Sequence, residues 1–191
     1  MNYGVGNLYS LSQALRREGV ETEIVTRPRS LRDADAVVLP GVGGFQAAVA
    51  KLPRDEILDL AKGGKTVVGI CLGMQLFLDK SEEGPGEGLG LFPGTVKLLP
   101  NRVKVPQMGW NTLKVKRRTE LTSGVRDGSW VYYVHSYYPQ TKGEWVQATC
   151  DYGLEFPTLL GWKGIIGTQF HPEKSGPTGA RILRNIIRMA S

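Results

Sequence analysis

The sequence predicts an α/β fold in which a mostly parallel central sheet is flanked by helices and carries a small antiparallel extension. Two short apolar runs, residues 36–39 and 66–70, have the composition of buried parallel strands, and each is followed by a turn. Helical patterns alternate with these runs at short spacing, as in parallel sheets that are covered on both faces. The second half of the chain holds strand-like runs that favour antiparallel hairpins. With 191 residues and no convincing linker, the chain is expected to form a single domain over residues 1–191.

In the first half of the chain, expected strands alternate with expected helices. The strand-like runs cover residues 21–26, 36–39 and 66–70. The helical patterns lie at residues 8–15, 57–61 and 72–78. Gly19 stands where the first helix would end, and Gly63 and Gly64 stop the second one. A glycine-rich turn at residues 40–44 follows the second strand-like run.

In the second half, a glycine-rich loop at residues 84–94 precedes a series of short strand-like runs. These runs cover residues 95–99, 112–115, 130–134, 145–149, 158–162 and 164–169. The last segment, residues 178–189, has isoleucine and leucine side chains on one helical face and arginines on the other. It is therefore expected to be an amphipathic surface helix.

The composition excludes several classes of protein. Apolar residues make up 41% of the chain and charged residues 22%, which argues against a disordered or fibrous protein. The apolar stretch without charge at residues 66–78 is shorter than the about 20 residues of a membrane span. The first residues do not form a signal peptide, so a cytoplasmic protein that does not bind membranes is expected. Two cysteines and two histidines argue against a metal site, and no cofactor is expected.

The net charge of +6 needs a separate interpretation. Lysines and arginines are scattered along the chain and are not interleaved with aromatic residues, as they would be in a platform that stacks nucleic-acid bases. The charge therefore favours a solvated surface, or a docking face for an acidic partner, over binding to nucleic acid.

Cys71 is the first candidate for a catalytic role. It lies between an apolar strand and a helix, with Gly69 before it and Gly73 after it, which is the pattern of a nucleophile elbow with cysteine in place of serine. The start of the helix would favour a thiolate, and the backbone N–H of Leu72 would point to the same place. A buried structural cysteine is the alternative, and the elbow pattern alone supports both interpretations equally.

His171 and Glu173 strengthen the catalytic interpretation. His171 follows the strand-like run at residues 164–169, and an imidazole can move protons to and from a thiol near neutral pH. Glu173 could then orient the imidazole and stabilise its charged form. Cys71 and His171 both follow predicted strands, and the carboxyl ends of parallel strands meet at one edge of a sheet. A surface turn would explain the His-Pro-Glu sequence by itself.

The other notable residues support weaker predictions. The glycines of residues 3–8 lack both a third glycine and a preceding strand, so dinucleotide binding is not expected. The turn at residues 40–43 could supply N–H donors to an oxyanion or could be a plain turn. His135 is expected to be structural or pocket-lining, and Cys150 to be structural. For Trp110, an interface role and a packing role are equally supported.

Taken together, these motifs resemble the class I glutamine amidotransferases, which use a catalytic triad. The resemblance rests on GICLGMQ at residues 69–75 and HPE at residues 171–173. More narrowly, the chain is similar to the glutaminase subunits of imidazole glycerol phosphate synthases. That similarity rests on YGVGNL at 3–8, PGVGGF at 40–45, SEE at 81–83, PQMGWN at 106–111 and HPEKSG at 171–176. It covers essentially the whole chain in the order found in the family.

The resemblance implies a glutaminase with a Cys71–His171–Glu173 triad. Cys71 would attack the carboxamide of glutamine to form a γ-glutamyl thioester, His171 would relay protons, and Glu173 would orient His171. The implied oxyanion donors are the N–H of Leu72 and one from the turn formed by Gly41, Val42 and Gly43. The residues implied to hold the amino and carboxylate groups of glutamine are Gln75, Glu83, Ser136 and Tyr137.

The resemblance also implies a partner. Ammonia would pass into a (β/α)8-barrel synthase subunit, which makes imidazole glycerol phosphate and an aminoimidazole carboxamide ribotide in histidine biosynthesis. The two subunits would form a heterodimer, and the positions implied at the interface are Asn7, Trp110, Tyr132 and Lys174. The family normally begins with a short apolar strand, whereas only Met1 and Asn2 precede Tyr3 here. A truncated first strand is therefore expected.

Two alternatives remain beside this interpretation. One is a glutaminase that serves another synthase, such as those for anthranilate, GMP or pyridoxal phosphate, and the YGVGNL and MGWN motifs argue against it. The other is a catalytically silent docking subunit or a basic binding module. Labelling of Cys71 by an electrophilic glutamine analogue would separate a silent subunit from an enzyme.

Overall fold

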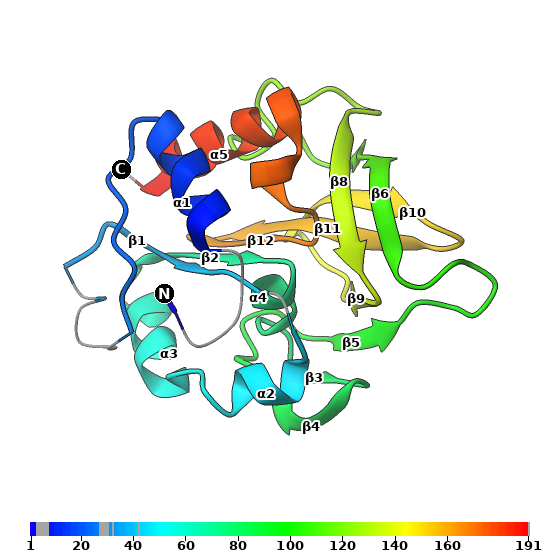
Figure 1. The fold of residues 1–191 in the computed structure, drawn as a ribbon, viewed down its shortest axis with the longest axis horizontal. Helices are drawn as coiled ribbons and strands as arrows, with labels where there is room; N and C mark the ends of the chain where they lie inside the picture. The colour runs from blue at the N-terminus through cyan, green and yellow to red at the C-terminus, as the bar shows by residue number, and fades with distance from the viewer. Residues whose placement is uncertain (3–7, 27–30, 32, 42, 191) are drawn as a thin grey trace.

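A computed structural model describes residues 1–2, 8–26, 31, 33–41 and 43–190 of the chain. Within this part, six strands form the main sheet in the order β1-β2-β12-β11-β10-β7. Helices α1 and α5 lie on one side of its parallel portion, and α2 and α3 lie on the other (Figure 1). The predicted α/β class, with helices on both faces of a sheet, is confirmed.

The main sheet is mixed. Its strands are β1 (Ala36–Leu39), β2 (Thr66–Ile70), β7 (Lys114–Val115), β10 (Val146–Asp151), β11 (Glu155–Trp162) and β12 (Ile165–Thr168). Strand β2 is parallel to both β1 and β12. Strand β11 is antiparallel to β12 and β10, and β10 is antiparallel to β7. The antiparallel part is thus larger than the small extension that the sequence predicts.

The other strands of the described residues form two smaller sheets. One has the order β4-β3-β5-β9, made of β4 (Gly84–Glu87), β3 (Lys80–Ser81), β5 (Thr95–Leu98) and β9 (Tyr137–Gln140). The other pairs β6 (Gln107–Thr112) with β8 (Trp130–His135) in antiparallel register. Strand β9 continues β8 after Ser136, so the two small sheets are joined directly in the chain.

The helices follow the sequence signals for their ends. They are α1 (Leu8–Arg17), α2 (Phe45–Val49), α3 (Arg54–Lys62), α4 (Leu72–Gln75) and α5 (Gly176–Ala190), with a short 3-10 helix η2 at Pro172–Lys174. Gly19 and Gly64 have φ of 83° and 82°, a left-handed conformation that suits glycine after a helix. The α5 helix buries Ile182, Leu183 and Ile186, as its amphipathic pattern predicts.

Three predicted elements differ from the structure. The glycine-rich loop expected at residues 84–94 contains strand β4 (Gly84–Glu87). Residues 21–26 are not a strand in the structure. Among the described residues, the Val25 carbonyl accepts from the N–H of Asn2 (2.7 Å), and one such bond does not make the ladder of backbone hydrogen bonds that a strand requires. The helix expected over residues 72–78 ends at Gln75 and continues as turns. Helix α2 has too short an apolar pattern to be predicted. The expected single domain and truncated first strand stay predictions.

Two hydrophobic clusters of the described residues cover the two faces of the parallel strands. Val67 of β2 packs in the cluster that contains Leu39 and Met74. Val68 and Ile70 pack in the other cluster, which also contains Ile166 and Ile182. Successive residues of a strand point to opposite faces, so β2 is buried on both sides and reads as a continuous apolar run. Among the described residues, no helix is long and apolar enough to cross a membrane.

Candidate active site

The strand β2 and the helix α4 meet in a sharp turn at Cys71. The backbone of Cys71 has φ 55° and ψ −107°, a conformation that L-residues rarely adopt and that marks functional turns. Its N–H donates to the carbonyl of Thr168 on β12 (2.7 Å). The flanking glycines are required by packing, because a Cβ at Gly73 would overlap the carbonyl oxygen of Leu39 and one at Gly69 would press on the backbone of Gly73. The sharp strand–turn–helix geometry that the elbow pattern predicts is present.

The sulfur of Cys71 is enclosed by polar groups from distant parts of the chain. Cys71 is 6% exposed, so little of the thiol is open to solvent. The thiol donates to the carbonyl of Val134 on β8 (3.7 Å), and Nε2 of Gln169 donates to the sulfur (3.6 Å). Gln169 was not among the predicted site residues, and only its closeness to His171 in sequence could have indicated it.

His171 and Glu173 form a buried pair, as predicted. Nδ1 of His171 lies 2.8 Å from Oε1 of Glu173, which assigns the Nδ1 proton to this hydrogen bond. The His171 N–H donates to the carbonyl of Tyr132 (2.9 Å), and the Ser175 hydroxyl donates to the His171 carbonyl (2.6 Å). The imidazole is therefore held from both its ring and its backbone, and Nε2 is left for chemistry.

The electrostatics connect His171 with Cys71. Burial alone lowers the pKa of His171, but the neighbouring Cys71 sulfur and then the Glu173 carboxylate outweigh it and raise the pKa to about 9. Within the described residues, Nε2 of His171 has no hydrogen-bond partner. At neutral pH His171 is therefore an imidazolium that faces the Cys71 sulfur and can give up its Nε2 proton.

The glycine-rich turn after β1 packs against the elbow. A Cβ at Gly41 would overlap the side chain of Leu72, so only glycine allows this approach. Gly43 has φ 128°, again a conformation that favours glycine. The first N–H groups of α4, including that of Leu72, lie in the helical turn whose donors have no acceptor within the helix. Of the predicted oxyanion residues, Gly41 packs directly against Leu72, Gly43 follows in the same turn, and Val42 lies outside the described part.

The predicted substrate-binding residues lie around the same turn and the start of β9. Nε2 of Gln75 donates to the carbonyl of Tyr137 (2.9 Å). Ser136 directly precedes Tyr137, and its carbonyl accepts from the N–H of Leu99 (2.9 Å). Oε2 of Glu83 accepts from the N–H of Phe45 (2.7 Å), which places this carboxylate at the end of the glycine-rich turn.

The predicted interface residues lie on the β6–β8 hairpin and on η2. Trp110 and Tyr132 are cross-strand partners whose ring centroids are 6.0 Å apart, and Nζ of Lys174 is 5.9 Å from the centroid of the Tyr132 ring. Trp110 is 53% exposed. Met108 and Trp130 are also exposed on this hairpin and were not predicted. Asn7 lies outside the described residues.

His135, expected to be structural or pocket-lining, and Cys150, expected to be structural, are both buried. Nδ1 of His135 donates to the carbonyl of Tyr137 (2.8 Å), so His135 supports the backbone of a predicted substrate-binding residue. Burial lowers the pKa of His135 to about 4, with a small opposing effect of that hydrogen bond, so the ring is neutral at physiological pH. A neutral, buried imidazole does not compete with His171 as the proton carrier.

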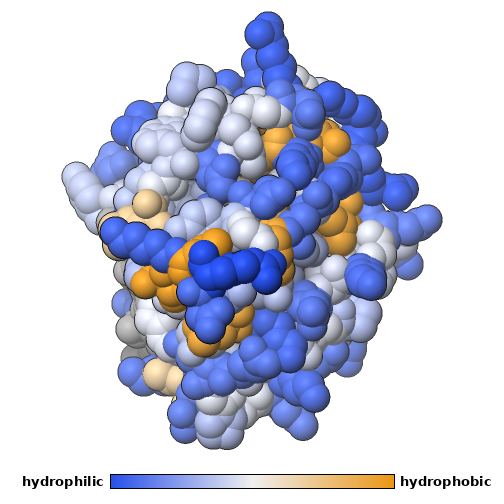
Figure 2. Space-filling view, turned by 90° about the vertical axis from the view of Figure 1, so that its right-hand side faces the viewer, coloured by the Kyte–Doolittle hydropathy of each residue, from blue (hydrophilic) through white to orange (hydrophobic). Residues whose placement is uncertain are grey.

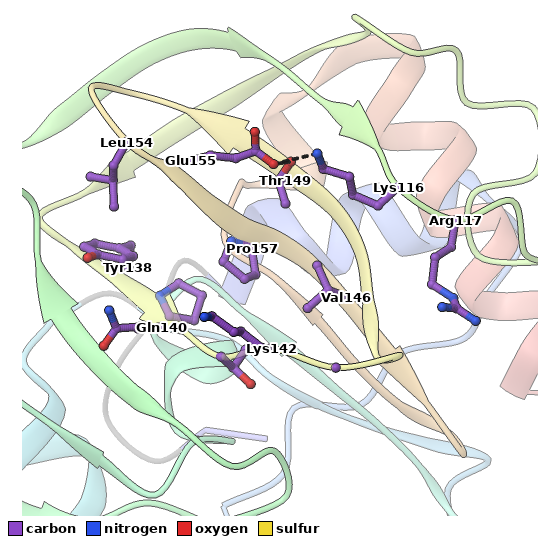
Figure 3. Close-up of a pocket in the computed structure, with 13 residues that line it drawn as sticks. Lys116, Arg117, Tyr138, Gln140, Lys142, Val146, Thr149, Leu154, Glu155 and Pro157 are labelled. Atoms are coloured by element: carbon purple, nitrogen blue, oxygen red, sulfur yellow. Dashed lines mark hydrogen bonds and ion pairs between the residues drawn. The ribbon is translucent and has the colours of Figure 1, made fainter.

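A surface cleft of about 520 Å³ lies elsewhere on the molecule. It is lined mainly by β9 and the segment that follows it and by β10 and β11, and Glu155 pairs there with Lys116 (2.6 Å; Figure 3). None of Cys71, His171 and Glu173 lines this cleft. Hydrophilic side chains cover most of the end of the molecule that carries β6 and β10, with apolar patches between them (Figure 2). The groups of the candidate site therefore gather at the elbow and not at this cleft.

Comparisons with known proteins agree with this geometry. The family model for the class-I glutamine amidotransferases matches residues 1–190. The chain is 48% identical to the "Imidazole glycerol phosphate synthase subunit HisH" of Archaeoglobus fulgidus, with 99% of this chain and 96% of that protein covered. It is also 48% identical to the protein of the same name from Methanopyrus kandleri, with 100% and 97% covered. The protein of that name from Methanosarcina mazei is 46% identical, with 99% and 96% covered.

Solved structures show the same fold at lower identity. A crystal structure of a glutamine amidotransferase has a TM-score of 0.76 and 20% identity, with 97% of this chain and 95% of that chain covered. A putative GMP synthase protein from Thermoplasma acidophilum has a TM-score of 0.77 and 21% identity, with 100% and 91% covered. The strand-end site and the full-length matches lead to one assignment. The chain belongs to the class-I glutamine amidotransferases and, within them, to the HisH subunits of imidazole glycerol phosphate synthase.

Proposed function

We propose that this chain hydrolyses glutamine to glutamate and ammonia at Cys71, and supplies the ammonia to the (β/α)8-barrel subunit of imidazole glycerol phosphate synthase in histidine biosynthesis. The observation that carries the proposal is the arrangement of three groups. Cys71 stands at a strained elbow, a charged His171 faces it, and Glu173 holds the far nitrogen of His171 at 2.8 Å. A nucleophile, a proton carrier and an orienting carboxylate are the parts that amide hydrolysis through a thioester requires.

The first half of the reaction forms the thioester. The Cys71 thiolate attacks the side-chain carbonyl carbon of glutamine, and the negative charge on the carbonyl oxygen is stabilised by N–H groups of Leu72 and of the turn at Gly41–Gly43. The His171 imidazolium gives its Nε2 proton to the leaving nitrogen. The C–N bond breaks, ammonia leaves, and His171 becomes neutral. Glu173 keeps the Nδ1 proton in place throughout.

The second half hydrolyses the thioester. Neutral His171 takes a proton from water, and the hydroxide attacks the thioester carbon at the same oxyanion site. The C–S bond then breaks, which releases glutamate and restores the thiolate and imidazolium. The new carboxyl group loses its proton to water, so the sum of the two halves is glutamine and water going to glutamate, ammonia and a proton, with no cofactor.

The substrate is positioned by the residues around the elbow. The Glu83 carboxylate is suited to the α-ammonium group of glutamine. Gln75, Ser136 and Tyr137 supply polar groups for the α-carboxylate and the backbone of the substrate. Glu83 also fixes the N–H of Phe45 at 2.7 Å, so substrate binding and the oxyanion turn depend on one carboxylate.

The triad is tested by Cys71→Ala in the complex with the barrel subunit and its ligand. Glutamate release should be lost, while synthase activity supplied with ammonium salt should persist. The matched control is Cys150→Ala, which removes the other buried cysteine and should retain both activities. Loss of both activities in Cys71→Ala would show that Cys71 is structural.

The exposed hairpin face is the proposed contact with the barrel subunit. Trp110, Tyr132 and Lys174 lie on one surface within the distances given above, next to the carbonyls of Tyr132 and Val134 that touch the catalytic groups. Trp110→Ala should weaken the complex by at least about tenfold, because large aromatic side chains dominate such interfaces. Trp162→Ala is the control. Trp162 is also exposed, but it pairs with Ile165 at the start of β12, the end of the parallel strands that lies away from Cys71 and His171. Equal affinities for both variants would contradict the proposed surface.

A further inference from the structure

Gln169 is a buried glutamine whose side chain the proposed reaction does not use. It follows β12 directly and precedes His171 by two residues, and its side chain is fully buried. Its amide lies between two residues of the site. Oε1 accepts from Nε2 of Gln75 (3.1 Å), and Nε2 donates to the sulfur of Cys71 (3.6 Å).

The orientation of this amide is fixed by a chain of contacts that begins at a backbone carbonyl. The carbonyl oxygen of Tyr137 can only accept, so the Gln75 atom that lies 2.9 Å from it must be the NH₂ group. The same NH₂ group meets Gln169, so Gln169 must present its oxygen there. The other end of the Gln169 amide, which faces the Cys71 sulfur, must therefore be the donor.

A donor in this position is useful only to a negatively charged sulfur. A neutral thiol is a weak acceptor, so burying an amide N–H against it gains little. A thiolate is a charged acceptor, and hydrogen bonds to charged groups are about twice as strong as neutral ones. The thiol form also has its own partner, because it donates to the carbonyl of Val134. The pocket thus offers one partner to the thiol and another to the thiolate.

We propose that Gln169 is a catalytic residue that donates from Nε2 to the Cys71 thiolate. This inference rests on the proposed glutaminase function. The hydrogen bond holds the charged sulfur in position before attack and receives it again when the C–S bond of the intermediate breaks. Through Oε1, Gln169 also connects the nucleophile with Gln75, a proposed substrate-binding residue.

Two variants of the full chain separate this role from packing. Gln169→Glu keeps the oxygen that accepts from Gln75 and replaces the donor that faces the sulfur. Gln169→Met has a similar shape and no donor. Both should lower the glutamine-dependent kcat of the complex by about 10- to 100-fold. Synthase activity supplied with ammonium salt should be unchanged.

The decisive readout is the pH dependence of Cys71 alkylation by iodoacetamide, followed by mass spectrometry of the peptide. In both Gln169 variants, the pH of half-maximal reaction should rise by about one unit relative to the unmodified chain. The matched control is Gln107→Met, because Gln107 is a buried glutamine whose Nε2 donates to the sulfur of the other cysteine, Cys150 (3.9 Å). That variant should leave the alkylation of Cys71 unchanged.

The outcomes distinguish the two proposals. If glutamate release depends on Cys71 but both Gln169 variants keep the alkylation midpoint and kcat, the role of Gln169 is refuted and the glutaminase stands. A lowered melting temperature with an unchanged midpoint likewise refutes it, since packing alone would explain that result. If the unmodified complex does not hydrolyse glutamine, the proposed function itself fails.

Discussion

Acid should destabilise this chain through His135. The imidazole is buried on β8, with its ring centroid 5.5 Å from that of Phe156 and 5.6 Å from that of Tyr133. Burial disfavours the charged form, and the hydrogen bond to the Tyr137 carbonyl only partly offsets this, so the pKa is lowered to about 4. In the unfolded chain the pKa returns to its usual value of about 6.5.

The sign and size of the effect follow from these two values. Between pH 6.5 and 4, His135 binds a proton in the unfolded chain but not in the folded chain. The stability that a neutral His135 contributes is therefore complete above pH 6.5 and is lost as the pH falls toward 4. The full difference corresponds to about 3 kcal/mol, and the part between pH 7 and pH 5 to about 2 kcal/mol. The raised pKa of His171 acts in the opposite sense, with its stabilisation lost between pH 6.5 and about 9.

The assay is urea unfolding at pH 7 and pH 5, followed by tryptophan fluorescence, for the unmodified chain and for His135→Asn. Asparagine can still donate to the Tyr137 carbonyl but does not titrate. The variant should be less stable at pH 7, because it leaves space in the core. Its free energy of unfolding should nevertheless fall by about 2 kcal/mol less on going to pH 5. Parallel losses in the two proteins would refute the assignment of a neutral, buried His135.

Two further predictions concern the elbow and its electrostatics. Gly73→Ala should lower the free energy of unfolding by roughly 2–5 kcal/mol and impair glutamate release, because its Cβ would overlap the Leu39 carbonyl oxygen. In Gly19→Ala the new Cβ would meet only open space, although the backbone φ is 83°, so the free energy of unfolding should fall by only about 1 kcal/mol. Equal melting temperatures for the two variants would contradict the overlap argument. An NMR titration of His171 should give a pKa of about 9 in the unmodified chain and lower values in Cys71→Ala and Glu173→Gln, since the sulfur and the carboxylate raise it. Identical values in all three proteins would show that neither group controls the imidazole.

The parts of the site that are local in sequence could be predicted. The elbow at Cys71 is encoded by an apolar strand, two close glycines and a following helix within a few residues. The His171–Glu173 pair is similarly local, with only Pro172 between its members. In these cases the residues that form a contact are also close in the chain, so pattern and chemistry point to the same place.

The contacts that could not be predicted join distant segments. Gln169 meets the Cys71 sulfur across 98 positions, and Gln75 meets Tyr137 across 62. No local pattern specifies which strands lie together, so the pairing of β6 with β8 and the exposed Met108 were not foreseen. The prediction of a strand at residues 21–26 was wrong for the same reason. Its alternation is local, but a strand forms only when a neighbour completes the ladder.

The parallel part of the sheet explains why these separate segments form one site. Leu39 of β1 is in register with Gly69 of β2, and Gly69 is in register with Gly167 of β12. The three strands therefore end at the same edge, and adjacent strands are only about 4.8 Å apart. The glycine-rich turn follows β1, Cys71 follows β2, and Gln169 and His171 follow β12. The proposed oxyanion donors, nucleophile and proton carrier are thus spaced by the hydrogen-bond ladder rather than by loop conformation. A substitution that disturbs the β1–β2–β12 register should therefore impair all three functions together, whereas one on the β6–β8 hairpin should act on the partner while leaving the triad in place.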